Sequence, residues 1–283
     1  MKPEDSRALL RSAGLRPKKS FGQNFLVEER VTQAIARACV PDDELGRARV
    51  VELGAGLGAL TRHLATRARR LYAIERDREL VPVLREALAD VAVEIIEGDA
   101  QTVELATLFG DADPDSPRVL CGNLPYQITG RLLQRAVEHA ASLERAVFMV
   151  QEEVADRLTA KPSTKEYGGL TVFVRAAFDV TRVMRVSRGC FHPPPDVTSA
   201  VVLFASRGAA RVEETPTFRA LVRGAFEARR KTLRNAWGNV GTPAAIAAAA
   251  ASSGVSLDAR GETLDVAAYA RMAAALDAGR GGE

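Results

Sequence analysis

Short apolar runs alternate with amphipathic stretches along most of the chain. Apolar runs bounded by turn residues predict buried strands, and apolar residues spaced three or four apart predict helices. This alternation predicts an α/β fold, a parallel sheet with helices on both faces. The expected strands are Arg49–Leu53, Leu71–Glu75, Val91–Glu97, Arg118–Gly122 and Ala146–Gln151, and the expected helices are Glu28–Ala38, Ala59–Ala68, Glu79–Leu88 and Ile128–His139.

The pattern changes in the last third of the chain. We expect a helix over Gly168–Phe178 and two paired strands near the sheet edge, Asp179–Val186 and Val197–Ala205. Beyond a linker at Arg207–Ala210 the pattern is wholly helical, with Thr-Pro pairs that place proline at the first helical position. These helices begin at Thr215-Pro216 and Thr242-Pro243, and the last lies near Val266–Asp277. The sequence therefore predicts a basic arm over 1–20 (a short helix and a mobile segment), an α/β domain over 21–206 and a small all-helical domain over 207–283.

Composition limits the class of protein. The chain has 283 residues, 47% hydrophobic and 27% charged, with a net charge of +3, which is typical of a soluble globular protein. Three distant cysteines and three scattered histidines predict neither a disulfide framework nor a metal site. The charged start is unlike a secretory signal, and no apolar run reaches the ~18 residues of a membrane span. We therefore expect a cytoplasmic protein with no membrane partner.

A glycine-rich turn follows the first strand. Val50–Leu53 leads into Gly54-Ala55-Gly56-Leu57-Gly58-Ala59, and Glu75 ends the next strand. Glycines allow close approach of the backbone to a ligand. An acid at the end of the next strand, about 20 residues further along the chain, can accept both hydroxyls of a ribose. On this loop alone, the pyrophosphate of NAD and S-adenosylmethionine fit equally well.

Three further features favour S-adenosylmethionine. Glu52 lies just before the glycines, separated from them by Leu53, and an acid there is usual in methyltransferases and not in the dinucleotide fingerprint. Gly98-Asp99-Ala100 follows the third strand, where an Asp can accept a hydrogen bond from an adenine amino group. Asn123-Leu124-Pro125-Tyr126 follows the fourth strand. All these loops lie at carboxyl ends of strands, where open α/β sheets bind ligands.

The Asn123–Tyr126 segment predicts the chemistry. The Asn123 side-chain oxygen and a carbonyl stiffened by Pro125 can accept both N–H groups of a planar amine, and the Tyr126 ring can stack on the attached base. Such a site suits the exocyclic nitrogen of adenine. The segment therefore predicts an adenine-N6 methyltransferase.

With these motifs, the chain resembles the ribosomal RNA adenine dimethyltransferases, in particular the bacterial group that acts on small-subunit (16S) rRNA. The resemblance covers nearly the whole length. The matching segments are Lys19–Leu26, Glu52–Thr61, Glu75, Gly98–Ala100, Asn123–Tyr126, Val150–Leu158, Tyr167-Gly168, the Phe191-x-Pro193-x-Pro195-x-Val197-x-Ser199 motif and Arg229–Asn235. The chain departs from the family at Asp196, where many relatives carry a basic residue, so a phosphate contact there loses its support.

The resemblance implies roles for residues on both sides of a methyl-transfer site. For S-adenosylmethionine, it implies contacts from Gln23, Asn24, Leu26, Gly54, Gly56, Glu75 with its neighbour Arg76, Asp99, Ala100 and Asn123. For the target adenine, it implies Asn123, the Leu124 carbonyl, Pro125, Tyr126 and Phe191, with the two rings enclosing the base. It also implies two adjacent adenines of 16S rRNA as substrate, within the 30S subunit or its precursor, and an enzyme that acts as a monomer.

Two basic clusters are candidates for RNA contact, because cationic side chains neutralise phosphates. Arg16, Lys18 and Lys19 precede the first cofactor motif, and Arg229, Arg230, Lys231 and Arg234 lie on a stretch expected to be helical.

Four alternatives remain open. A sister enzyme that methylates large-subunit rRNA and confers antibiotic resistance shares the site, although Arg229–Asn235 and Arg260–Leu264 favour the small-subunit group. A DNA adenine methyltransferase usually carries an added target-recognition domain. An NAD-linked oxidoreductase leaves Asn123–Tyr126 without a purpose. A non-catalytic assembly or transcription factor on the same fold does not require that segment.

Overall fold

The structure is a computed structural model that describes residues 3–111, 113 and 115–280. It divides into two compact units, Met1–Ala155 with Val180–Ser206, and Asp156–Asp179 with Arg207–Glu283. We call the first the sheet unit and the second the helical unit. The sequence analysis placed 156–179 within the α/β domain. In the structure this segment belongs to the helical unit, because Val172 and Ala176 lie in the same core as Trp237.

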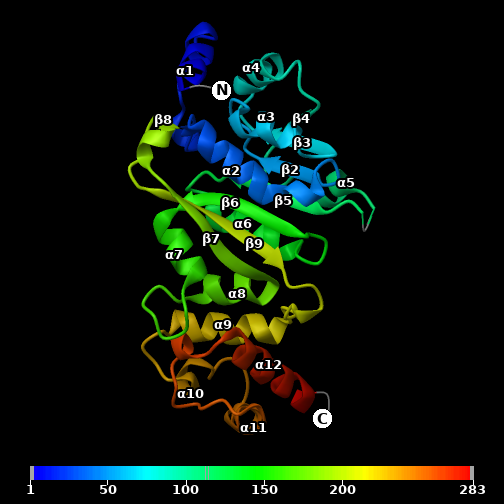
Figure 1. The fold of residues 1–283 in the computed structure, drawn as a ribbon. Coiled ribbons are helices and arrows are strands. Elements are labelled where there is room, and N and C mark those ends of the chain that lie inside the picture. Colours follow the sequence, from blue (N-terminus) through cyan, green and yellow to red (C-terminus); the bar gives the residue numbers. More distant parts are fainter. Residues whose placement is uncertain (1–2, 112, 114, 281–283) are drawn as a thin grey trace. The chain divides into compact units, whose positions relative to one another are not determined.

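A seven-stranded sheet forms the centre of the sheet unit, in the order β4-β3-β2-β5-β6-β9-β7 (Figure 1). Strands β2 to β6 pair in parallel, and β9 pairs antiparallel with β6. The strands are β2 Arg49–Leu53, β3 Arg70–Glu75, β4 Glu94–Glu97, β5 Arg118–Asn123, β6 Arg145–Gln151, β7 Phe178–Val186 and β9 Ser199–Ser206. The predicted parallel sheet and the paired strands near its edge are confirmed.

Helices and short elements surround this sheet. The helices are α1 Pro3–Ser12, α2 Glu29–Cys39, α3 Ala59–Ala65, α4 Leu80–Ala87, α5 Leu105–Phe109, α6 Thr129–Glu138 and α7 Glu152–Thr159. Ile35 of α2 and Leu64 of α3 pack against Val50, Val119 and Val147, so both helices cover one face of the sheet. The sequence missed α5, α7 and a small antiparallel pair, β1 Phe25–Leu26 with β8 Phe191–His192.

One predicted strand begins later than expected, and the predicted N-terminal helix is present. The strand predicted over 91–97 begins only at Glu94, because Val91 and Val93 form turn hydrogen bonds to Leu88 and Val91 carbonyls. The N-terminal arm was expected to be a helix followed by a mobile segment. The helix is present as α1, and it packs on the sheet unit through buried Leu10, which clusters with Phe25, Leu57 and Leu80.

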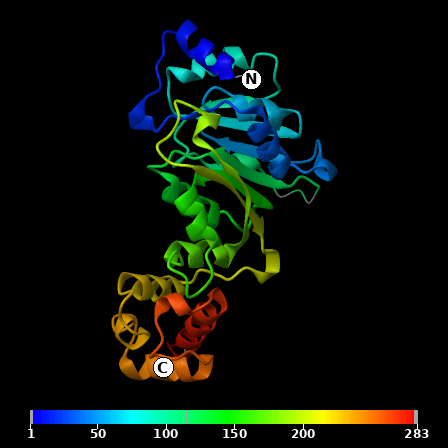
Figure 2. The ribbon, with the colours of Figure 1, turned by 60° about the vertical axis from the view of Figure 1, so that its left-hand side comes forward.

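The helical unit has its own apolar core, and its helices are drawn in Figure 2. Its helices are α8 Gly169–Ala177, α9 Pro216–Glu227, α10 Leu233–Ala236, α11 Pro243–Ser253 and α12 Val266–Arg280. The two Thr-Pro starts are confirmed, since the hydroxyls of Thr215 and Thr242 accept hydrogen bonds from backbone N–H groups in the first turn. Buried Trp237 and Tyr269 have their polar atoms bonded to the carbonyls of Leu221 and Gly261.

Gly122 allows β2 and β5 to approach each other near the site. A Cβ atom at this position would lie 2.4 Å from the Leu53 carbonyl oxygen, a backbone atom that cannot yield cheaply. We therefore expect Gly122→Ala to destabilise the protein by about 2 kcal/mol or more in denaturant unfolding. Gly130→Ala in α6 is the control, since nothing lies within 4 Å of its added Cβ. Equal stability of the two variants would contradict this account.

Candidate active site

A cavity of about 370 Å³ lies in the sheet unit. Its walls come from the carboxyl ends of β2, β3 and β5, the loop after β4 and the segment over Ser20–Leu26. Ligands bind at this end of open α/β sheets because the loops that follow neighbouring strands converge there. Residues from sequence segments 20–26, 52–60, 74–76, 98–100 and 123–128 thus line one space.

The glycine loop and Glu75 form one wall. Gly54 and Gly56 have positive φ angles of 78° and 58°, and a Cβ on Gly56 would lie 3.1 Å from the Phe25 ring. The Glu75 carboxylate accepts hydrogen bonds from the backbone N–H groups of Gly56 and Asp77, both at 2.8 Å. Burial raises the pKa of Glu75, and these backbone bonds partly offset that effect. The carboxylate is fixed in place and retains lone pairs that can accept from hydroxyls of a ligand.

The Asp99 loop forms the next wall. Asp99 Oδ1 accepts from the Gln101 backbone N–H at 2.8 Å, and Arg76 lies 3.4 Å from Oδ2. Arg135 of α6 donates to the carbonyl oxygens of Ala100, at 2.7 Å, and of Val103. These contacts fix the loop from the helix side. Sequence reasoning missed Arg135, since one arginine on an amphipathic helix carries no distinguishing signal.

Hydrogen bonds determine the orientation of the Asn123 amide. Its Nδ2 donates to the Asn24 carbonyl oxygen at 3.0 Å, so the network assigns Oδ1 as the free acceptor. The next residue is also held, because Leu124 N donates to the Met149 carbonyl at 3.1 Å. Asn123 and Leu124 both line the cavity. The site therefore presents a side-chain acceptor and an adjacent fixed backbone.

Tyr126 is anchored at its hydroxyl. The Tyr126 and Ser199 hydroxyl oxygens lie 2.8 Å apart, and Ser199 is fully buried at the start of β9. Burial raises the pKa of Tyr126. A ring held at its polar end and exposed to the cavity can offer a face to a planar ligand.

Glu52 is a buried acid at the cavity wall. Its side chain is 2% exposed, and within the described residues its Oε2 atom has no hydrogen-bond partner. Burial raises the pKa of Glu52 to about 8. An unpaired acid oxygen beside a cavity favours a ligand that brings a hydrogen-bond donor or positive charge.

The family model for "Ribosomal RNA adenine dimethylase" matches residues 14–278. The chain belongs to this family. Among curated relatives, the ribosomal RNA small subunit methyltransferase A of Anaeromyxobacter sp. (strain K) is 44% identical over 275 residues, covering 94% of this chain and 95% of the relative. The corresponding protein of Geobacter metallireducens is 42% identical over 275 residues, covering 94% and 98%.

Solved structures support the fold. A dimethyladenosine transferase from Plasmodium falciparum matches with a TM-score of 0.71 at 23% identity, over 88% of this chain and 95% of that one. The 23S rRNA methyltransferase ErmE matches with a TM-score of 0.67 at 28% identity, over 90% and 100%. The sheet unit thus has the Rossmann-like fold of class I methyltransferases. Membership of an adenine dimethylase family argues against the NAD-linked alternative.

The structure brings together almost all the residues that the sequence predicted to contact the methyl donor or the target adenine. The cavity lining includes Gln23, Asn24, Leu26, Gly54, Gly56, Glu75, Arg76, Asp99, Ala100 and Asn123–Tyr126. Phe191 is the exception. It is 3% exposed, pairs with Leu26 through β8, and packs in the core with Val31 and Ile35. Its contact with a target base stays a prediction.

The residues of the N-terminal basic cluster differ in their surroundings. Arg16 is exposed, and the side chain of Lys19 lies outside the described part. Lys18 Nζ lies 2.8 Å from Asp77 and 3.1 Å from Glu79, so two carboxylates already balance its charge. RNA contact by this cluster stays a prediction, and Lys18 is its weakest member.

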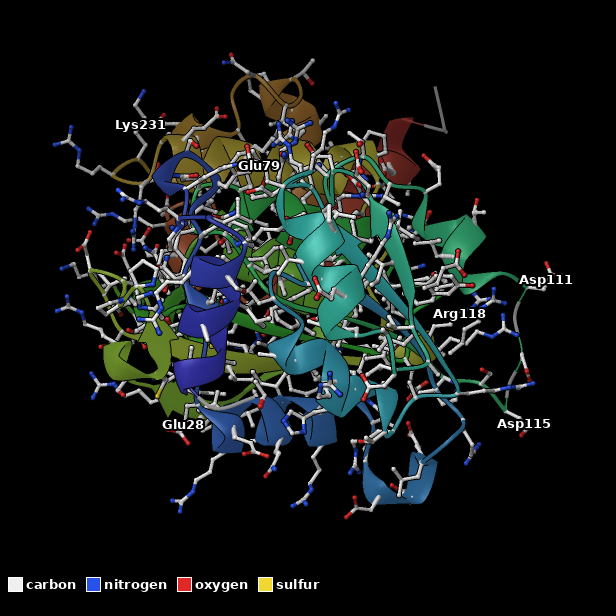
Figure 3. All side chains as sticks on the ribbon, turned by 90° about the horizontal axis from the view of Figure 1, so that it is seen from above. Glu28, Glu79, Asp111, Asp115, Arg118 and Lys231 are labelled. Atoms are coloured by element: carbon white, nitrogen blue, oxygen red, sulfur yellow. The ribbon has the colours of Figure 1, made fainter. Side chains whose placement is uncertain are left out.

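The C-terminal basic cluster was predicted on a helix, which is wrong for its first three members. Helix α9 ends at Glu227, and Arg229, Arg230 and Lys231 lie exposed in the turn before α10. Lys231 projects away from the ribbon (Figure 3). Only Arg234 is helical, and it forms an ion pair with Asp258 at 3.1 Å. The three turn residues are therefore exposed on the surface of the helical unit.

The described residues hold no group of three metal-ligating side chains. Within the same residues, no helix is long and apolar enough to cross a membrane.

The raised pKa of Glu52 predicts a pH effect on stability. The pKa is about 8 in the folded chain, against an ordinary value of 4.5. Between these values the folded state keeps a proton that the unfolded state releases, so the free energy of unfolding falls as pH rises through this window. Glutamine does not titrate, so the free energy of unfolding of Glu52→Gln does not fall in this way. Without ligand, the stability of Glu52→Gln relative to the wild type should therefore increase from pH 5 to pH 8, by at most about 1.4 kcal/mol per pH unit.

Thermal unfolding of both proteins across this pH range measures the effect. The control is Glu94→Gln, because Glu94 is 57% exposed on β4. A difference between wild type and Glu52→Gln that does not change with pH would contradict a neutral buried acid.

Proposed function

We propose that this protein transfers methyl groups from S-adenosylmethionine to the N6 amino groups of two adjacent adenines near the 3′ end of 16S rRNA, giving N6,N6-dimethyladenosine. The observation that carries the proposal is the orientation of Asn123, whose Nδ2 is occupied by Asn24 and whose Oδ1 is therefore an acceptor at the cavity. An acceptor of this kind suits an amine donor and not a carbonyl substrate.

The residues lining the cavity fit S-adenosylmethionine. The fixed carboxylate of Glu75 would hold the ribose, with Asp99 and the Ala100 backbone at the adenine and Gly54 and Gly56 along the methionine part. The unpaired Oε2 of Glu52 suits a cationic molecule better than a neutral one. When bound, S-adenosylmethionine supplies an electrophilic methyl group on a sulfonium.

Asn123 and Leu124 would act on the electron distribution of the target amine. The lone pair of an adenine amino group is delocalised into the ring, so the nitrogen is a poor nucleophile. Hydrogen bonds from its two N–H groups to Asn123 Oδ1 and the Leu124 carbonyl would draw them out of the ring plane and localise the lone pair. Stacking on Tyr126 would offset the cost of extracting the base from its stack, by ~1–3 kcal/mol. Alignment of the reacting atoms would supply much of the rate enhancement.

The small subunit is the proposed substrate for two reasons. The curated relatives that are 42–44% identical are named as small-subunit methyltransferases, whereas ErmE, named as a 23S rRNA methyltransferase, is 28% identical. Large-subunit rRNA is the alternative. We further propose that the protein acts as a monomer in the cytoplasm, on the 30S subunit or its precursor, and contributes to small-subunit biogenesis.

The substrate is tested by incubating the protein with radiolabelled S-adenosylmethionine and unmethylated small ribosomal subunits. Large-subunit RNA and duplex DNA are the controls, and digestion to nucleosides identifies the product. We expect labelled N6,N6-dimethyladenosine only with small subunits. Label in large-subunit RNA would establish the alternative, and absence of label with methyl-donor binding intact would refute catalysis on the free subunit.

Asn123→Ala tests the amine acceptor. Loss of Oδ1 removes one hydrogen bond that localises the lone pair, and we expect methyl transfer to fall by about 100-fold or more. Calorimetry should show that S-adenosylmethionine still binds. An equal loss of binding and transfer would refute the proposed role of Asn123.

The basic turn of the helical unit predicts a salt-dependent RNA affinity. Arg230 and Lys231 are exposed, so replacing both with Ala should weaken small-subunit binding and lower the slope of log affinity against log salt by about 2. Arg234→Ala is the matched control, because Asp258 already pairs with this guanidinium. A salt slope unchanged by the double substitution would remove the turn from the RNA interface.

A further inference from the structure

Lys18–Leu26, which we call the lid segment, contributes one wall of the cavity. Residues Ser20 to Leu26 line it, and Phe25 and Leu26 are attached to β8 as strand β1. Before Phe25 the segment has little regular structure beyond a single turn at Lys19–Phe21. Its position therefore depends on side-chain contacts with the rest of the sheet unit.

Asp77 accepts two side-chain hydrogen bonds from the lid segment. Its Oδ1 accepts from Lys18 Nζ at 2.8 Å, and its Oδ2 accepts from Gln23 Nε2 at 2.7 Å. Lys18 and Gln23 are also joined to each other, since Lys18 N donates to Gln23 Oε1 at 2.7 Å. One carboxylate thus holds the lid segment at its first residue, Lys18, and again at Gln23.

The environment of Asp77 makes these bonds strong. Asp77 is 3% exposed, although its partner Lys18 is at the surface. Burial raises the pKa of Asp77, but the hydrogen bonds from Lys18 and Gln23 outweigh burial, and its pKa lies below the ordinary value. A buried carboxylate that loses hydrogen-bond donors is destabilised by the loss, and an open lid segment would leave Asp77 with the Glu79 backbone N–H but without its two side-chain donors.

Asp77 is also connected to both sides of the proposed reaction. Its backbone N–H donates to Glu75 Oε1, the acid proposed to hold the ribose. At the other end of the lid segment, the Asn24 carbonyl accepts from Asn123 Nδ2 and so determines which way the Asn123 amide faces. A displaced lid segment would therefore loosen the methyl-donor site and release the Asn123 amide together.

We propose that Asp77 is a positioning residue that holds the lid segment closed through Lys18 and Gln23, and thereby retains the methyl donor and keeps Asn123 Oδ1 directed at the target amine. The proposal rests on the proposed function for the identity of the ligand. Closure itself depends only on contacts within this chain. Opening the lid segment breaks the Asp77 bonds, so methyl-donor release should accelerate when they are absent.

The chain offers a matched control in Glu79. It also contacts Lys18, at 3.1 Å, but its side chain is 60% exposed, and exposed ion pairs contribute little. Asp77→Ala removes the buried acceptor, and Glu79→Gln removes only the negative charge of the exposed partner. Lys18→Met removes the cation from the surface side without altering the core, which covers the possibility that Asp77→Ala disturbs folding.

Hydrogen exchange of the full-length protein without ligand tests closure directly. We expect exchange in the peptide covering residues 18–26 to accelerate about tenfold or more in Asp77→Ala, somewhat less in Lys18→Met, and under about twofold in Glu79→Gln. Asp77→Asn should recover part of the protection, because its amide oxygen can still accept one bond. Unchanged exchange in Asp77→Ala, or an equal effect in Glu79→Gln, would overturn the proposal.

Stopped-flow dissociation of S-adenosylmethionine gives the second readout. We expect the variants to rank in the same order for the dissociation rate, with about a tenfold increase in Asp77→Ala. In steady-state kinetics, the KM for the methyl donor should rise by a larger factor than kcat falls. Faster exchange of the lid segment without faster release would overturn the retention role. If the wild type binds no S-adenosylmethionine, the proposed function fails, and hydrogen exchange still decides whether Asp77 closes the lid segment.

Discussion

The site depends above all on the parallel pairing of β2 with β5. This pairing brings the glycine turn after β2 beside the Asn123 segment after β5, although about 70 residues separate them. Only glycine fits at position 122, since a Cβ atom there would meet the Leu53 carbonyl at 2.4 Å. Close approach of two backbones therefore sets the distance between the groups proposed to hold the methyl donor and those proposed to hold the target amine. Neither loop could compensate for a shift in register between these strands.

Electrostatics within the cavity follow from burial and not from the modest net charge of the chain. Glu52 and Glu75 both lie buried at the ends of neighbouring strands, and burial raises the pKa of each. They differ in how their oxygens are satisfied. Backbone N–H groups hold Glu75, whereas Oε2 of Glu52 has no partner among the described residues. The oxygens of Glu75 are preorganised to accept hydrogen bonds from hydroxyl groups. The buried Oε2 of Glu52 lacks a partner, and a cationic ligand could supply one.

Much of the fold and of the site could be predicted from the sequence. Strand Arg49–Leu53 was predicted with its observed bounds, and both Thr-Pro starts were correct, because apolar runs and capping residues act locally. Segment 156–179 could not be assigned to the helical unit, because its packing partners, such as Trp237, lie far along the chain. Asp77 could not be distinguished either. Its partners, Lys18 and Gln23, are more than fifty residues away, and an acid after a strand is ordinary.

Phe191 shows how the same motif can serve packing and chemistry. Family resemblance assigns its ring to the target base, yet here the ring packs between β1 and α2 residues, directly across from Leu26 of the lid segment. Ser199, from the same motif, holds the Tyr126 hydroxyl. The motif therefore anchors two parts of the cavity, the lid segment through β8 and the Tyr126 ring through β9. For Phe191 to reach a base it would have to leave the core, and the β1–β8 pair that supports the lid segment would have to adjust with it. A base enclosed by both rings, as the resemblance implies, would therefore require the lid segment to shift.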